Sequence, residues 1–239
     1  MSNLPGGAIS KRPLHFVWVV DTSGSMADKG KMQILNNAVR EAVPHMQKVA
    51  EDNPHAEVLV RVLRFSDGAQ WINNTPIPIS QFKWYDLYPE GETQMGKAFS
   101  MLADHLSTSH MPERGLPPVL VLMSDGMPTD DANAGLKVLF EQEWGKRAVR
   151  IAIAIGDENN VDLETLQKFI GNNEIKPLTA GNAESLVNYI KWSSTAVLKF
   201  VSSPPSQFRD RDTQKSVTVQ IPEPPPPILP DSGGPLEPW

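Results

Sequence analysis

Three short segments of this 239-residue chain carry oxygen-bearing side chains at spacings that suit metal coordination. The first holds Asp21, Ser23 and Ser25, each two residues apart, so the two hydroxyls point the same way if the loop is extended. Thr93 follows in a Gly-Glu-Thr-Gln segment, and Asp125 follows in Ser-Asp-Gly. Two carboxylates and three hydroxyls form an all-oxygen set. Such a set suits a hard cation, Mg²⁺ first, with Mn²⁺ or Ca²⁺ as substitutes, and disfavours zinc and copper.

The elements in front of these segments should bring the two aspartates together. Residues 14–20 and 119–123 are short apolar runs, typical of strands buried on both faces of a parallel sheet. Asp21 and Asp125 follow their ends. In open α/β sheets, ligands bind outside the carboxyl ends of the strands, where the strand order reverses. If the two strands are neighbours, both aspartates face one crevice.

Apolar runs alternate with helical periodicity along the rest of the domain. We expect helices at 30–51, 94–108, 132–145, 162–170 and 183–201, and further strands at 57–65, 69–72, 149–155 and 174–178. Pro44 should kink or break the first helix, and residues 73–91 read as irregular. This alternation predicts an α/β fold, a doubly wound and mostly parallel sheet with helices on both faces.

The prolines set the domain boundaries. Ten of the 22 lie between Pro204 and Pro238, where a packed core is not expected. We therefore divide the chain into an N-terminal extension at 1–12, a folded domain at 13–203 and an extended proline-rich C-terminal tail at 204–239.

Composition excludes several classes of function. The chain has no cysteine, which excludes disulfides and thiolate metal sites, and its net charge of −6 offers no basic footprint for nucleic acid. It shows neither an apolar run near 20 residues nor a secretory signal, so we expect no membrane span and a cytoplasmic location.

Each segment also has an ordinary structural interpretation. Asp and Ser after a strand are good helix N-caps, and Asp-Gly is a common turn. An alternative interpretation makes Asp21 the nucleophile of an aspartate-based phosphohydrolase, but such enzymes need a second acid two residues later, where this chain has Ser23. The joint occurrence of all three segments, in order and after apolar strands, favours the metal site.

The three segments together resemble the metal-ion-dependent adhesion site (MIDAS) of von Willebrand factor A (VWA) domains, over about residues 13–195. The resemblance implies a VWA, Rossmann-like fold in which Ser23, Ser25 and Thr93 bind the metal directly. It implies that Asp21 and Asp125 act directly or through water. One coordination position is then left for an acidic side chain of a protein partner.

The rim of this site supplies candidate partner contacts. Two of them flank the threonine where smaller residues are common in the family, others come from an aromatic cluster, and one is the last residue of the chain. The candidates are Glu92, Gln94, Trp84, Tyr85, Met127 and Trp239. In the tail, residues 217–221 could add to a sheet edge while Trp239 fills a pocket; the alternative is a disordered, solubilising tail.

Segments 125–130, 155–159 and 191–194 resemble the bacterial cytoplasmic TerY/YegL-like subgroup. This resemblance implies a role in stress or tellurite-resistance phosphosignalling, with a Ser/Thr kinase and a PP2C-type phosphatase as partners. Some members carry a C-terminal zinc module, which a chain without cysteine cannot form. We therefore expect a Mg²⁺-dependent adaptor rather than an enzyme; a phage-defence component with the same adaptor chemistry and a self-assembling protein remain alternatives.

Overall fold

A computed structural model describes residues 11–156, 161–202 and 221–226. The strands are β1 (Arg12–Asp21), β2 (Ala56–Phe65), β3 (Ala69–Trp71), β4 (Ile77–Pro78), β5 (Val119–Ser124), β6 (Val149–Ile155) and β7 (Leu178–Ala180). The α-helices are α1 (Lys31–Glu51), α2 (Met95–His105), α3 (Ala132–Glu141), α4 (Glu143–Arg147), α5 (Leu163–Ile170) and α6 (Ala183–Ser202). Short 3₁₀ helices span Gly24–Gly30 and Ile79–Gln81.

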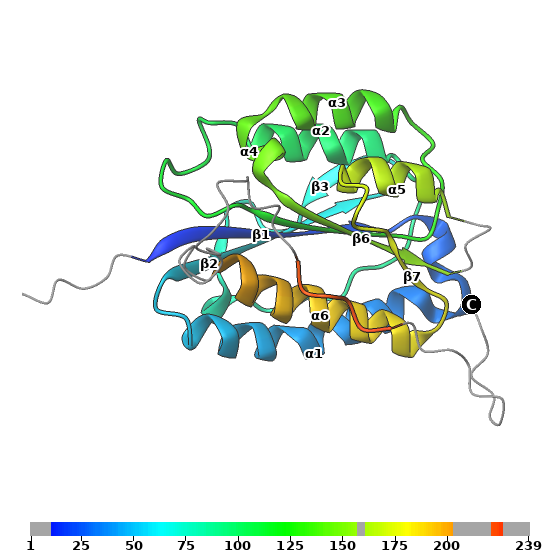
Figure 1. The fold of residues 1–239 in the computed structure, drawn as a ribbon. Coiled ribbons are helices and arrows are strands. Elements are labelled where there is room, and N and C mark those ends of the chain that lie inside the picture. Colours follow the sequence, from blue (N-terminus) through cyan, green and yellow to red (C-terminus); the bar gives the residue numbers. More distant parts are fainter. Residues whose placement is uncertain (1–10, 157–160, 203–220, 227–239) are drawn as a thin grey trace, which may run out of the picture.

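The strands form one sheet between two layers of helices. Figure 1 shows α1 and α6 on one face, and α2, α3, α4 and α5 on the other. The strand order is β3-β2-β1-β5-β6-β7, with β4 also paired to β2. All neighbours are parallel except β3 and β4, which run antiparallel to β2. The predicted α/β fold with a mostly parallel sheet is confirmed.

The reversal of strand order falls between β1 and β5. From β1 the chain moves outward to β2 and β3, and it then returns to pair β5 with the other edge of β1. Val20 lies opposite Met123 in this pair, so the two strands end at the same level. The expectation that these strands are neighbours is therefore confirmed, and the carboxyl ends that carry Asp21 and Asp125 lie side by side.

β1 is the central strand of the core. Phe16, Trp18 and Val20 pack into the cluster on the α1 and α6 side, whereas Val17 and Val19 pack into the cluster that includes α2, α3 and α5. All five side chains are fully buried. A strand buried on both faces holds its carboxyl end rigidly, which is what a site built on Asp21 requires.

Three predicted boundaries were wrong. Helix α1 runs without interruption through Pro44, because its buried side chains hold it against the sheet and α6. The helix predicted at 132–145 is two helices with the extended residue Gln142 between them, and α4 packs so tightly on α3 that a Cβ at Gly145 would lie 2.0 Å from the Leu139 carbonyl oxygen. The last strand begins only after Pro177, a residue with no N–H to donate.

No helix in the described ranges combines the length and the apolar character needed to cross a membrane.

Candidate metal site

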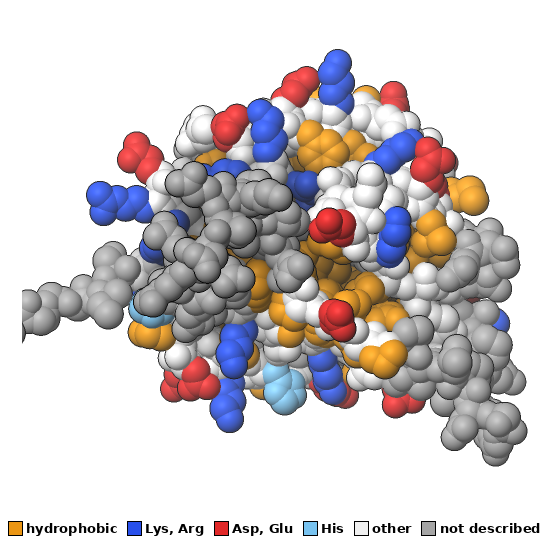
Figure 2. All heavy atoms as spheres, in the orientation of Figure 1, with side chains coloured by type: hydrophobic (Ala, Val, Ile, Leu, Met, Phe, Trp, Pro, Cys, Tyr) orange, Lys and Arg blue, Asp and Glu red, His pale blue; other side chains and the backbone are white. Residues whose placement is uncertain are grey.

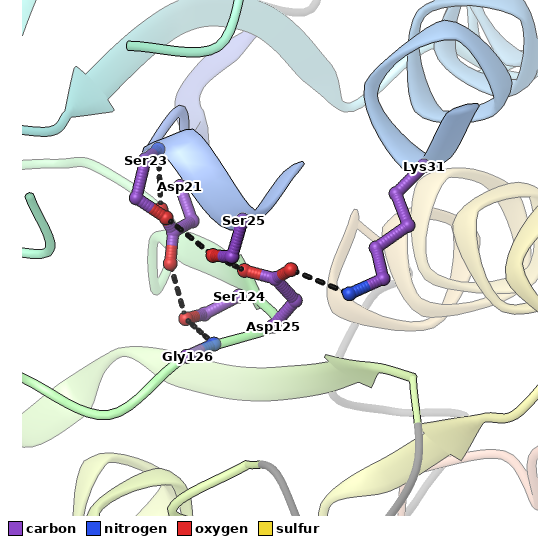
Figure 3. A network of polar contacts seen from close by, with 7 residues as sticks. All are labelled: Asp21, Ser23, Ser25, Lys31, Ser124, Asp125 and Gly126. Carbon is purple, nitrogen blue, oxygen red and sulfur yellow. Dashed lines mark hydrogen bonds and ion pairs between the residues drawn. The ribbon is translucent and has the colours of Figure 1, made fainter. Parts of the chain in front are cut away.

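Asp21 is the innermost residue of the site. Its Oδ1 accepts a hydrogen bond from the Ser23 N–H at 2.8 Å, and its Oδ2 accepts one from Ser124 Oγ at 2.5 Å (Figure 3). The side chain is fully buried. Burial raises the pKa of Asp21 to about 6, and the charge of Asp125 adds to this, although the hydrogen bonds from Ser124 and Ser23 act in the opposite direction. A cation close to this buried carboxylate would therefore stabilise its ionised form.

The two serines join the first segment to the third. Ser23 Oγ lies 3.0 Å from Ser25 Oγ, and Ser25 Oγ donates to Asp125 Oδ1 at 2.8 Å (Figure 3). Adjacent ligands of an octahedral Mg²⁺ with metal–oxygen bonds of about 2.1 Å are roughly 3.0 Å apart. The spacing of these oxygens therefore equals the edge of such an octahedron.

Gly126 leaves the space in which the second segment meets the others. A Cβ on this glycine would lie 3.3 Å from Thr93 Oγ1 and 3.9 Å from Ser25 Oγ, so both hydroxyls lie beside the same open position. Thr93 is held there from both sides, because its N–H donates to Thr129 Oγ1 and its carbonyl accepts from the Thr129 N–H. A side chain at position 126 would fill this cradle.

The loop before Thr93 is tied to the first segment through the backbone. The Gly24 N–H donates to the Gly91 carbonyl at 3.0 Å, and the Glu90 N–H donates to the Thr22 carbonyl at 2.7 Å. These bonds explain why Thr93, distant in sequence, lies beside the ends of β1 and β5. The three predicted segments therefore meet at one edge of the sheet.

The chemistry of the donor set fits a small hard cation. Within the described residues there is no group of three or more His, Asp or Glu side chains that could hold a metal. An ion bound at this end of the sheet would use the hydroxyls of Ser23, Ser25 and Thr93 together with the two carboxylates. Mg²⁺ is commonly bound through one or two carboxylates with other oxygens, including waters, completing its shell.

Lys31 is a residue of this site that the sequence analysis missed. It is the first residue of α1, and its Nζ donates to Asp125 Oδ2 at 2.7 Å, with the side chain 13% exposed (Figure 3). The turn before it places Lys29 and Gly30 in the left-handed region, at φ of 49° and 70°. A lysine just after a glycine, ten residues beyond Asp21, was the only signal in the sequence. Its ammonium balances the charge of Asp125.

The predicted rim residues take different positions. Tyr85, Glu92 and Met127 are exposed, while Gln94 is half-buried. Trp84 is turned inward: its Nε1 donates to Asn36 Oδ1 at 3.0 Å and its ring packs against Trp18. Trp84 thus anchors the loop to α1. Trp239 lies outside the described residues.

Tyr88, from the same aromatic cluster as Trp84 and Tyr85, is 74% exposed, and Tyr85 is 71% exposed. Between them, Leu87 is buried and bonded through its backbone to the Asn36 side chain. The loop therefore presents two tyrosines while its inner residues fix it to α1.

Comparison with known protein families gives one match that covers most of the chain. A family model described as the von Willebrand factor type A domain matches residues 16–189. A search of curated proteins found no match.

Several solved structures share the fold at low identity. The ArnB paralog VWA2 from Sulfolobus acidocaldarius is 16% identical, with a TM-score of 0.55 over 76% of this chain and 45% of that chain. The pilus adhesin SpaC from Lactobacillus rhamnosus GG, in its open conformation, is 14% identical, with a TM-score of 0.61 over 80% and 30%. The PilB minor pilin from Streptococcus sanguinis is 16% identical, with a TM-score of 0.59 over 82% and 64%. The chain spans less than two thirds of the length of each of these structures.

Proposed function

The chain belongs to the von Willebrand factor type A family, and on this premise we propose that it is a Mg²⁺-dependent protein-binding module. Asp21, Ser23, Ser25, Thr93 and Asp125 would hold the ion, directly or through water. A carboxylate from an Asp or Glu of a partner protein would complete its coordination shell. The observation that carries the proposal is the convergence of these five oxygen-bearing side chains from three separate segments: hydrogen bonds join the first and third segments, and Thr93 and Ser25 both lie beside Gly126.

The charges of the site favour an anionic partner group. Asp21 and Asp125 contribute two negative charges, which a divalent ion would cancel, and Lys31 adds one positive charge. The loaded site would therefore carry a net positive charge. A partner carboxylate is attracted to such a position, because Coulomb interactions are strong where the surroundings are buried.

The surface around the site suits contact with a protein, so we propose that the ligating carboxylate belongs to a protein rather than to a small free anion. Tyr85, Tyr88 and Met127 are among the most exposed large hydrophobic side chains of the described chain. The tyrosines lie in the loop that the Glu90 and Gly91 backbone joins to the first segment. Aromatic residues and methionine are enriched at interfaces, so these side chains suit contacts around a ligating acid.

The site weighs against an aspartate-based phosphohydrolase. A nucleophilic carboxylate needs a free oxygen that substrate can reach, whereas both oxygens of Asp21 accept hydrogen bonds and the side chain is fully buried. We therefore propose a binding function without catalysis.

The finer role in this proposal rests on sequence motifs alone. Segments 125–130, 155–159 and 191–194 support a TerY/YegL-like adaptor in stress or tellurite-resistance phosphosignalling, with a Ser/Thr kinase and a PP2C-type phosphatase as partners. A phage-defence role would use the same metal chemistry. Purification of the bound partner, with Mg²⁺ and again with EDTA, separates these roles by identifying the protein.

Calorimetric titration with MgCl₂ tests the metal site. Thr93→Val removes one ligand oxygen without changing the size of the side chain, and it should weaken Mg²⁺ binding at least tenfold. Thr22→Val is the matched control, because this neighbouring buried hydroxyl donates to the Phe65 carbonyl, a backbone group of β2. Equal affinities of the two variants would overturn the proposed site.

The partner's role is tested on the protein that co-purifies with the chain in Mg²⁺. Replacing its acidic residues one at a time by the matching amides should reveal one whose loss abolishes binding as completely as EDTA does. If every single replacement leaves binding intact, no partner carboxylate completes the metal shell.

A further inference from the structure

Helix α6 is covered on more sides than an ordinary surface helix. Of its 20 residues, only Glu184 and Lys199 are exposed. Helix α1, in the same layer, has 21 residues, of which eight are exposed. A helix that rests on a sheet beside one neighbour normally keeps a polar outer face. Something besides the sheet and α1 therefore shields α6.

The shielded flank of α6 is the one that faces away from α1. Lys191 pairs with Glu41 of α1 at 2.9 Å, which fixes the flank that faces that helix. A stripe on the other flank is formed by Tyr189, Trp192 and Ala196, which are spaced three and four residues apart. At about 100° per residue, these side chains lie roughly 100–160° around the helix axis from Lys191. This stripe begins with two aromatic side chains. Aromatic-lined grooves bind polyproline segments in several protein families.

A proline-rich piece of the same chain lies against this side of the domain. Ile221 is half-buried and packs against the core cluster that contains Tyr189, with Trp192 at its margin. Figure 1 shows residues 221–226, in red, crossing α6 on its outer side. In the same orientation, Figure 2 shows hydrophobic side chains gathered in this middle part of the face. The family match ends at residue 189, so this contact is an addition to the family domain.

The burial of the segment follows the period of a polyproline II helix. All six of its residues are either proline or directly precede proline, which favours extended backbone throughout. Polyproline II has three residues per turn. Pro222 and Pro225, three apart, are half-buried with Ile221, whereas Glu223, Pro224 and Pro226 are exposed. One face of the segment therefore contacts the domain.

We propose that the flank of α6 opposite α1 is a binding site for proline-rich segments of the pattern Ile-Pro-x-x-Pro, and that the chain's own residues 221–226 occupy it. Ile221 is the apolar anchor, and Pro222 and Pro225 are the prolines that face the helix. This site is separate from the metal site and does not depend on it.

Because the segment and α6 belong to one chain, even a weak contact is sufficient to keep the segment docked. Eighteen residues of sequence separate the end of α6 from Ile221, and a tether of this kind gives an effective concentration on the order of 1 mM. A segment with an intrinsic Kd of about 0.1 mM would then be docked about ten times more often than not. The same occupancy would raise the apparent Kd of a competing peptide about tenfold.

Single cysteines test the docked geometry in the full chain, since the natural sequence contains none. We compare thiol labelling rates in native buffer and in denaturant for Pro222→Cys, Pro224→Cys, Pro225→Cys and Pro226→Cys. Each variant replaces the same residue type. Folding should slow labelling at 222 and 225, by at most about tenfold because each cysteine also removes one docking proline, and should leave it unchanged at 224 and 226. Equal native rates at all four positions would overturn the proposal.

The anchor and the binding site are tested with Ile221→Asp. Added to the Pro225→Cys variant, it should restore fast labelling, whereas Glu223→Gln should not. A labelled synthetic peptide of residues 216–230 should bind the full-length Ile221→Asp protein about tenfold more tightly than the natural protein, whose own segment competes. Persistent protection of the thiol in Ile221→Asp, or no peptide binding to it at millimolar concentration, would contradict the assignment.

Discussion

Replacement of Asp21 by asparagine should stabilise the metal-free protein while removing its response to metal. Burial raises the pKa of Asp21 from 3.8 to about 6. One pKa unit corresponds to about 1.36 kcal/mol, so keeping this carboxylate ionised at pH 7 costs the folded state roughly 3 kcal/mol. Asparagine has the same shape, stays neutral and can keep the contacts with Ser23 and Ser124. We expect it to stabilise the metal-free protein by about 2 kcal/mol.

The sign of the pH dependence follows from the same shift. A folded-state pKa above the unfolded value means that the folded protein binds the proton more tightly, so stability decreases as the pH rises from about 4 to about 6. The advantage of Asp21→Asn in EDTA should therefore be small at pH 4 and complete above pH 6. At this chain length it corresponds to a rise in Tm of about 4–8 °C.

Thermal melts in EDTA and in saturating MgCl₂ provide the assay. The natural protein should gain about 2.7 kcal/mol when Mg²⁺ is present at 100 times its Kd, whereas Asp21→Asn should gain far less. Asp52→Asn, at an exposed position after α1, is the control and should change stability by less than about 0.5 kcal/mol. A destabilised Asp21→Asn in EDTA, or one that responds fully to Mg²⁺, would refute the reasoning.

Three further predictions concern the surroundings of the site and the core. Lys31→Met should tighten Mg²⁺ binding about tenfold, or about 1.4 kcal/mol, because it frees one oxygen of Asp125 and removes a repelling charge. Calorimetric titration measures this affinity, and a weaker affinity in the variant would contradict the prediction. Asn36→Ala should lower the free energy of unfolding by about 3 kcal/mol, since it leaves the indole and backbone groups of the 84–91 loop unpaired; a loss below 0.5 kcal/mol in urea titrations would contradict this. Burial lowers the pKa of His15 to about 4 and that of His105 to about 3, so the folded protein resists their protonation and stability should fall by several kcal/mol as the pH drops from 6.5 to 4. Denaturant midpoints measured against pH for the Asp21→Asn variant in EDTA isolate this effect, because the variant removes the titration of Asp21. A midpoint that does not change between pH 6.5 and pH 4 would count against it.

The fold could be predicted because its strands are apolar runs with clear ends. The run at 14–20 is buried on both faces, as such a run in a parallel sheet should be. The pairing of β1 with β5 is only a condition of the sequence argument, and the structure supplies it. The helix break at Gln142 depends on how closely Gly145 packs on α3, and the path through Pro44 depends on tertiary contacts. Neither contact can be predicted from the local helix propensity of the sequence.

The site could be predicted as far as residue types and spacing carry it. The five oxygen donors lie in three local motifs, and although each motif alone could be an ordinary cap or turn, their joint occurrence points to the site. Lys31 reaches Asp125 only because the turn at Gly30 directs the start of α1 back over the site. From the sequence, Trp84 could either pack the long loop onto the core or belong to the partner-contact rim, and the structure shows the first, with Asn36 bonding to its indole. Both contacts join residues distant in sequence, which no local pattern reveals.

The central claim is that five side chains bind one divalent ion at the edge of the sheet. A crystal structure of the protein with Mn²⁺, located by its anomalous signal, tests it most directly. We expect one peak with the oxygens of Ser23, Ser25 and Thr93 at about 2.1 Å, and with Asp21 and Asp125 bound directly or through one water. A map at saturating Mn²⁺ with no peak beside Gly126, or with the ion held elsewhere, would contradict the claim.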